Sequence, residues 1–262
     1  MNHNQSKAGA GLWLQRMKHF IEGTSRMLAP SRRECLICHS PIQGEPPPLG
    51  LCRGCFGQIP WITDIRCPMC GRYEECHDCK RREEAFFRCS RSAVRYNELM
   101  KEWLALYKYR GQEKLLPVFG GMLYHGYSKL LQSGEWNGEA PDLITFTPVN
   151  EQRLLERGFN QAEQLARHLG REVKRPVVPL LRRVRYTGKQ SFKTRAERLA
   201  DLAGAFSLEE EAVRRLRAGH HGSPLRIVLV DDIYTTGSTL NQCSAVICSA
   251  LPAEVYGLAW AR

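Results

Sequence analysis

The chain has 262 residues, of which 43% are hydrophobic, and a formal net charge of +11 at pH 7. This length and composition suit one sizeable α/β domain with a small additional module. No apolar run approaches the ~20 residues that cross a bilayer, which excludes a membrane-inserted helix. The positive charge favours a polyanionic partner or a phosphorylated ligand, with solubility alone as the alternative.

Residues 1–30 are predicted to be an N-terminal extension outside the folded domains. The apolar residues of LWLQRMKHFI are interrupted by Arg16, Lys18 and His19, which makes this stretch a poor signal peptide. A short amphipathic helix or a frayed terminus is expected instead. The sequence therefore predicts a protein that stays in the cytoplasm.

Residues 31–90 are predicted to form a metal-binding module. Eight of the chain's eleven cysteines form four Cys-x-x-Cys pairs there, and disulfides would be unusual in the cytoplasm. A Cys-x-x-Cys turn places two thiolates on one ion, so sequential pairing predicts two structural zinc ions in a double zinc ribbon. Interleaved ligation of the same pairs is the alternative. The predicted ligands are Cys35, Cys38, Cys52 and Cys55 for one ion, and Cys67, Cys70, Cys76 and Cys79 for the other.

Residues 91–262 are predicted to form an α/β domain. The spacing of Leu99, Trp103 and Leu106 indicates that the region 91–135 is helical. Buried strands and helices then alternate, which implies a mainly parallel sheet with helices on both faces. The expected strands are 143–149, 226–230 and 255–260, and the expected helices are 160–169 and 238–251.

The strand at 226–230 ends on two acids, and a loop rich in hydroxyl groups follows. Ligands of open parallel sheets bind at the carboxyl ends of the strands, which is where Asp231 and Asp232 are expected. The backbone N–H groups of a loop that opens a helix suit a phosphate. The pattern therefore predicts a sugar phosphate site, with an acidic strand end before an ordinary capped helix as the alternative. The loop residues are Thr235, Thr236, Gly237, Ser238 and Thr239.

The stretch VLVDDIYTTGST resembles the phosphoribosyl pyrophosphate (PRPP) motif of type I phosphoribosyltransferases. The resemblance implies that Asp231 and Asp232 contact the ribose hydroxyls, directly or with help from Mg²⁺, and that the loop 235–239 binds the 5′-phosphate. TPVNEQRLLERGFNQAEQLA follows a strand where that family places its pyrophosphate loop. Arg153 and Arg157 are accordingly candidates to hold pyrophosphate, because arginine suits bidentate phosphate contact.

The segment 185–206 resembles the mobile loop that closes over the site in the same family. The residues of interest there are Arg185, Lys189, Gln190 and Arg198. With the acid pair, the resemblance gives four candidate catalytic residues, which are Asp231, Asp232, Lys189 and Arg185. Between residues 151 and 198 there are 13 Lys or Arg and 5 Asp or Glu. Much of the positive charge is therefore expected around the proposed anion site.

The four cysteine pairs, YKYRG, RGFNQ and VDDIYTTGST together closely resemble the ComF/GntX family. The resemblance implies a type I phosphoribosyltransferase-like domain behind a zinc ribbon, acting in uptake of single-stranded DNA during natural competence or in use of DNA as a nutrient. It also implies PRPP or a related ligand, single-stranded DNA and a competence helicase as partners. The alternatives are an active phosphoribosyltransferase of nucleotide metabolism and a non-catalytic PRPP sensor.

The sequence reaches Arg262 directly after the last expected strand. We therefore expect no C-terminal hood of the kind that grips the nucleobase in base-salvage phosphoribosyltransferases. The zinc module or the helices at 91–135 should then cover the site, or leave it open to a larger substrate.

Overall fold

The computed structural model describes residues 34–42, 44, 48–108, 113–134, 136, 140–184, 204–219 and 222–262. The extension 1–30 and residues 185–203 of the expected mobile loop, with Arg185, Lys189, Gln190 and Arg198, lie outside these ranges. Among the helices that are described, none has both the length and the apolar character needed to cross a membrane.

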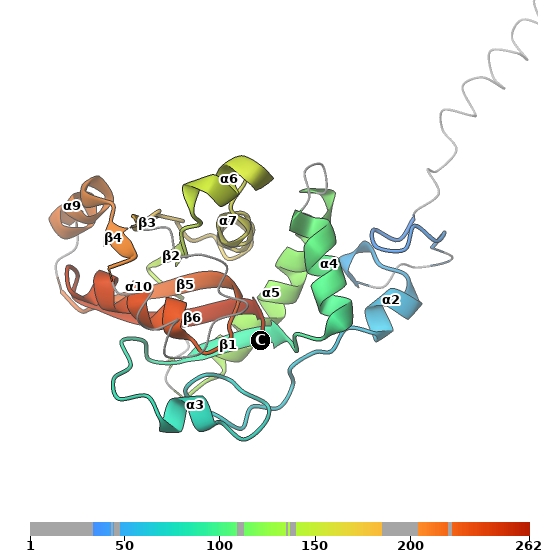
Figure 1. The fold of residues 1–262 in the computed structure, drawn as a ribbon, viewed down its shortest axis with the longest axis horizontal. Helices are drawn as coiled ribbons and strands as arrows, with labels where there is room; N and C mark the ends of the chain where they lie inside the picture. The colour runs from blue at the N-terminus through green and yellow to red at the C-terminus, as the bar shows by residue number, and fades with distance from the viewer. Residues whose placement is uncertain are drawn as a thin grey trace, which may run out of the picture.

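A four-stranded parallel sheet forms the centre of the fold (Figure 1). Its strands lie in the order β1 (Ser90–Val94), β6 (Ala253–Ala261), β5 (Leu225–Ile233) and β2 (Leu143–Phe146). Along β5, Val228 and Val230 enter one core, whereas Ile227 and Leu229 enter the other. Both faces of the sheet are buried, which explains why its central strands are almost continuously apolar.

Helices cover both faces of the sheet (Figure 1). On one face α5 (Leu116–Leu131) and α7 (Gln161–Glu172) pack against the strands, and α4 (Glu98–Lys108) shares their core. On the other face lies α10 (Ser238–Cys248). The other elements are η1 (Pro48–Gly50), α2 (Arg53–Gly57), α3 (His77–Lys80), η2 (Glu113–Leu115), α6 (Glu151–Arg157), α9 (Glu210–Gly219) and the antiparallel pair β3 (Leu181–Arg183) and β4 (Phe206–Leu208). The predicted α/β architecture, with a cysteine-rich module before it, is confirmed.

The prediction of a helical region 91–135 is wrong at its start, where β1 pairs with β6. The segment SRSAV forms a strand that the sequence pattern does not indicate, because three of its five residues are polar although all five are buried. Arg91 is tolerated there because its Nη1 donates to the carbonyl oxygens of Pro68 at 2.7 Å and Ser90 at 2.8 Å. Polar residues in a strand interrupt its apolar pattern, and here Arg91 Nε and the hydroxyls of Ser90 and Ser92 have no partner among the described residues.

The cysteine-rich module packs against both cores of the domain. Cys35 and Leu51 belong to the core that contains α4 and α5, whereas Cys70 and Phe87 belong to the core that contains α10. In Figure 1, α2 accordingly lies beside α4, and α3 lies below the sheet. The module is therefore integrated into the fold at two places.

Candidate functional site

The two acids stand at the carboxyl end of β5, beside the end of β2. The register pairs Phe146 with Val230, so Thr147 comes level with Asp231 and its Oγ1 donates to Asp231 Oδ1 at 2.8 Å. The same oxygen accepts from the backbone N–H of Asp232 at 2.9 Å. Burial, and next the charge of Asp232, raises the pKa of Asp231 to about 7. Asp231 is therefore the acid of the pair that is protonated more readily.

Lys108, the last residue of α4, provides the counter-charge of the acid pair. Its Nζ lies 3.0 Å from Asp232 Oδ2, and the two side chains keep 24% and 27% of their exposure. Burial opposes ionisation of Asp232, but the charge and hydrogen bond of Lys108, with help from the backbone N–H of Ile233 and from Arg157, lower its pKa. Asp232 is thus held as the carboxylate of the pair.

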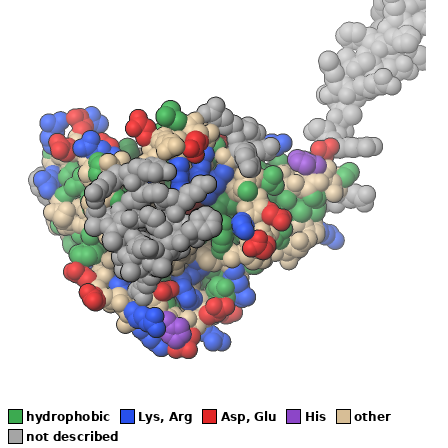
Figure 2. Space-filling model, viewed as in Figure 1, with side chains coloured by type: hydrophobic (Ala, Val, Ile, Leu, Met, Phe, Trp, Pro, Cys, Tyr) green, Lys and Arg blue, Asp and Glu red, His purple; other side chains and the backbone are tan. Residues whose placement is uncertain are grey.

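Three arginines add positive charge to this edge of the sheet. Burial, and then the charge of Arg153, lowers the pKa of Arg157, while Asp232 opposes this effect. Burial and Arg153 likewise lower the pKa of Arg183, whose charge also interacts with Asp231. Figure 2 shows Lys and Arg side chains gathered on this face between α6 and α4. Cations crowded against one another favour an anionic ligand.

The RGFNQ segment builds the corner that holds one of these arginines. Gly158 ends α6 in the left-handed conformation, with φ of 86°. Asn160 caps α7, and its Nδ2 donates to the carbonyl of Thr147 at 3.0 Å. Gln161 Oε1 accepts from Arg157 Nη1 at 3.0 Å. The segment therefore fixes Arg157 and links the corner to the residue that holds the acid pair.

The loop after β5 opens α10 without a side-chain cap. Gly237 is the N-cap residue, with φ of 76°. The hydroxyls of Thr236 and Ser238 bond to each other at 2.7 Å, whereas Thr235 is exposed and Thr239 is half-buried. The N–H of Ser238 reaches Thr236 Oγ1 at a long 3.4 Å, and an anion can supply better partners to the first N–H groups of the helix.

The structure thus brings the predicted acids, Arg153, Arg157 and the loop 235–239 to one edge of the sheet. It adds Lys108, Thr147 and Arg183, which sequence reasoning did not place in the site. For Lys108 a signal existed, because it lies in the YKYRG segment that carried the family resemblance. Thr147 and Arg183 reach the site only through the register of β2 and the position of β3.

The eight predicted zinc ligands form two clusters, in each of which all sulfur atoms lie within 4.8 Å of one another. Cys38 Sγ is 3.7 Å from Cys52 Sγ, and Cys70 Sγ is 3.5 Å from Cys76 Sγ. Four sulfurs at ~2.3 Å from one zinc ion would be about 3.8 Å apart, so both clusters have the size of a tetrahedral zinc site. The sequential grouping is confirmed, with Cys35, Cys38, Cys52 and Cys55 in one cluster and Cys67, Cys70, Cys76 and Cys79 in the other.

Both clusters contain a thiol whose pKa favours the thiolate, the form that binds metal. In the first cluster, hydrogen bonds from Ser40 lower the pKa of Cys38 to about 6. In the second, the hydrogen bond from the thiol of Cys79, with help from Arg262, lowers the pKa of Cys70 to about 4 against the effect of burial. Burial and contacts with neighbouring thiols raise the pKa of Cys55 and Cys67, and the hydrogen bond with Cys70, followed by burial, raises the pKa of Cys79. It is therefore the number, type and spacing of the sulfur donors that suit zinc.

Comparisons with known proteins give relatives along most of the chain. Competence protein ComFC of Bacillus subtilis is 29% identical over 225 residues, which cover 79% of this chain and 85% of the relative. Competence protein F of Haemophilus influenzae is 29% identical over 80% of this chain and 90% of the relative. The DNA utilization protein YhgH of Escherichia coli K12 is 32% identical over 110 residues, which cover 42% of this chain and 44% of the relative.

No protein-family model matches the chain. Among solved structures, adenine phosphoribosyltransferase from Thermoanaerobacter pseudethanolicus aligns with a TM-score of 0.31 and 15% identity, over 56% of this chain and 80% of that one. That similarity is too distant to carry an argument. The matches to the competence proteins extend along most of both chains, and the described residues contain the two cysteine clusters and the acid pair. Along most of its length the chain is therefore similar to the competence proteins ComFC and F, which supports the resemblance to the ComF family seen in the sequence.

Proposed function

We propose that this protein binds PRPP with Mg²⁺ at the carboxyl edge of the sheet and acts in the cytoplasm in uptake or use of single-stranded DNA. The observation that supports binding most directly is the meeting of the acid pair, several cations and an uncapped helix N-terminus at one edge. The names of the relatives, competence protein and DNA utilization protein, support the biological role.

Each part of the site takes one part of the ligand in this proposal. The ribose hydroxyls donate to Asp231 and Asp232, directly or through Mg²⁺, and the loop 235–239 receives the 5′-phosphate. Arg153 and Arg157 hold the pyrophosphate, and the nearby Lys108 and Arg183 add positive charge. The two cysteine clusters each hold one structural zinc ion, which stabilises a module with little core of its own.

The proposed DNA partner is supported by a second basic surface. A depression of about 380 Å³ at the end of α7 is lined, within the part of the chain that is described, by four cations and no acid. These cations are Arg167, Arg171, Lys174 and Arg175. Cations arranged in this way suit a nucleic acid backbone. A competence helicase is the protein partner that the resemblance to the ComF family suggests.

Replacement of both acids by asparagine tests the site and its role together. D231N/D232N nearly preserves shape but removes the charge, so the fold and zinc content should survive. PRPP affinity should fall by ~1.5–3 kcal/mol for each charge-assisted hydrogen bond that the ligand no longer makes. Isothermal titration measures this decrease, with the exposed Asp64→Asn as the control. Wild-type affinity in the double variant would refute the site.

The same variant, placed in cells, tests whether PRPP binding is needed for the uptake or use of DNA. If PRPP binding serves DNA uptake or use, the variant strain should lose transformation, or growth on DNA, as fully as a deletion strain. Normal transformation by a protein that no longer binds PRPP would refute that role.

Whether the protein also catalyses transfer is a separate question with its own assay. A phosphoribosyltransferase must release pyrophosphate, so the protein is incubated with PRPP, Mg²⁺ and each nucleobase, and pyrophosphate is measured. Release with one base would assign an active enzyme, for which Lys189 and Arg185 are the proposed additional catalytic residues. Saturable PRPP binding without release would assign a binding protein or sensor.

A further inference from the structure

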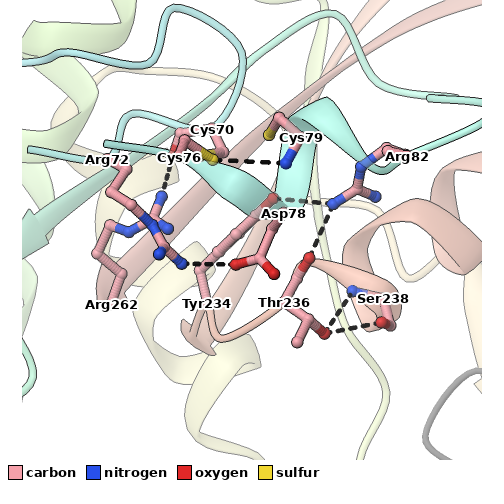
Figure 3. A network of polar contacts seen from close by, with 10 residues as sticks. All are labelled: Cys70, Arg72, Cys76, Asp78, Cys79, Arg82, Tyr234, Thr236, Ser238 and Arg262. Atoms are coloured by element: carbon pink, nitrogen blue, oxygen red, sulfur yellow. Dashed lines mark hydrogen bonds and ion pairs between the residues drawn. The ribbon is translucent and has the colours of Figure 1, made fainter. Parts of the chain in front are cut away.

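The second cysteine cluster (Cys67, Cys70, Cys76 and Cys79) is connected to the loop that opens α10 by one arginine (Figure 3). Arg82 Nη2 donates to the carbonyl oxygen of Thr236 at 2.8 Å and to Tyr234 Oη at 3.3 Å. The backbone N–H of Arg82 donates to the carbonyl of Cys79 at 3.3 Å. The position of the metal ligand Cys79 therefore fixes the backbone of Arg82, from which the arginine side chain extends.

The contact with Thr236 determines the orientation of one peptide group. A peptide group is planar, with its carbonyl and its N–H pointing in opposite directions. By holding the carbonyl of Thr236, Arg82 directs the N–H of Gly237 away from the cysteine cluster, at the N-terminus of α10. Glycine is the residue that most readily allows such a peptide to turn over. The contact is close, since a Cβ on Gly237 would lie 2.9 Å from Arg82 Nη2 and 2.1 Å from Tyr234 Oη.

A second connection, through Arg262 and Tyr234, reaches the same loop from the other side of the cluster. Tyr234 is only 4% exposed, and the guanidinium of Arg262 lies 4.8 Å from the centre of its ring. Arg262 Nη1 donates to the carbonyl of Cys70. The start of the loop is thus held by two arginines, Arg262 hydrogen-bonded to Cys70 and Arg82 hydrogen-bonded to Cys79 (Figure 3).

Besides its hydrogen bonds to the loop, Arg82 has a favourable contact with an aromatic ring and one buried atom without a partner in the described part of the chain. Its guanidinium lies 5.2 Å from the ring centre of Phe87, and its Nε is buried with no partner among the described residues. Docking of the module does not depend on it, because Asn241 on α10 accepts from the N–H of Phe86 at 2.9 Å and donates to the carbonyl of Glu84 at 3.1 Å. Loss of the Arg82 side chain should therefore leave the module in place.

We propose that the second cysteine cluster, with zinc bound, sets the affinity of the α10 loop for the 5′-phosphate by positioning Arg82. This inference rests on the proposed function and assigns the cluster a role in regulating the same site. Arg82 is a positioning residue, because it acts through the peptide between Thr236 and Gly237. With zinc bound, ligation by the four thiolates fixes Cys79 and therefore the position of Arg82, which is hydrogen-bonded to it. Without zinc the position of Arg82 is less restrained, and the N–H of Gly237 is no longer held toward the phosphate.

Two ligands that use different parts of the site test the role of Arg82. Ribose 5-phosphate depends on the loop, whereas pyrophosphate depends on Arg153 and Arg157. By isothermal titration, Arg82→Ala should bind ribose 5-phosphate about ten- to hundredfold more weakly, the value of a hydrogen bond to a charged group, with pyrophosphate affinity unchanged. The neighbouring exposed Arg81→Ala is the matched control. Equally weakened binding of both ligands, or unchanged binding of both, would overturn the proposal.

Two serine variants test the role of the cluster. Cys76→Ser should remove about one zinc ion and weaken ribose 5-phosphate binding as Arg82→Ala does. Cys38→Ser, in the first cluster, should also remove about one zinc ion but leave that affinity unchanged. An equal effect of the two variants would overturn the specific coupling. A wild-type protein that binds neither ribose 5-phosphate nor PRPP would overturn the proposed function itself, and the inference with it.

Discussion

Replacement of Lys108 by methionine removes the cation of the acid pair while keeping most of the side-chain volume. The Nζ–Oδ2 distance of 3.0 Å to Asp232 would correspond to about 5.5 kcal/mol at an effective dielectric constant of about 20. About a quarter of each side chain is exposed, so solvent reduces this value, and exposed pairs contribute ~0–1 kcal/mol. Lys108→Met is therefore expected to lower the free energy of unfolding by about 1–2 kcal/mol at pH 6, between these limits.

The destabilisation should increase as the pH rises through about 7. The folded-state pKa of Asp231, raised to about 7, lies above its unfolded value of ~3.9. Ionisation of Asp231 thus lowers stability as the pH rises through the folded-state pKa. Lys108 opposes this pKa increase, so its removal makes ionisation of Asp231 more costly. In an Asp231→Asn background the increase with pH should disappear.

Urea denaturation between pH 6 and pH 9 measures both effects. The matched control is Lys101→Met, on the same helix, whose 3.2 Å pair with Glu98 is largely exposed and should contribute less than ~1 kcal/mol without dependence on pH. The description of the acid pair is refuted if the two variants lower the free energy of unfolding by amounts that agree within ~0.5 kcal/mol at every pH. In that case Lys108 does not hold Asp232 in solution.

Two further measurements test the metal and the DNA partner. Metal analysis of the reduced protein should return about two zinc ions per chain, because two clusters of four sulfurs are present; one equivalent or none would contradict the double site. Titration of a labelled single-stranded oligonucleotide should show binding that weakens steeply with salt, because neutralised phosphates release counterions. Failure to bind at low salt would remove DNA from the proposed partners.

The features that the sequence predicts well are those written in adjacent residues. Cys-x-x-Cys spacing is itself the geometry of two ligands on one ion, so the sequence predicts the eight ligands, and the structure decides for sequential over interleaved pairing. Asp231 and Asp232 end an apolar strand, and the carboxyl end of such a strand is where parallel sheets bind ligands. In both cases no long-range contact has to be known.

The features that the sequence misses depend on contacts between distant segments. Lys108 pairs with an acid 124 positions away, and Arg82 holds a carbonyl 154 positions away. Nothing local distinguishes Arg82 from a solvated surface cation, and Lys108 is marked only by its place in the YKYRG segment. The strand β1 is missed for the same reason, since the partners of Arg91 come from the cysteine module and from the strand itself.

The cysteine module also explains how a small α/β domain assembles its ligand site. The first cluster shares its core with α4, which ends at Lys108 beside Asp232. The second cluster shares its core with α10 and holds the loop at Thr236 through Arg82. The cation at the acid pair and the peptide in the loop before α10 are therefore each supported by one cluster, on opposite faces of the sheet. Because the clusters support different halves of the site, loss of one metal should impair one part of ligand recognition before the other.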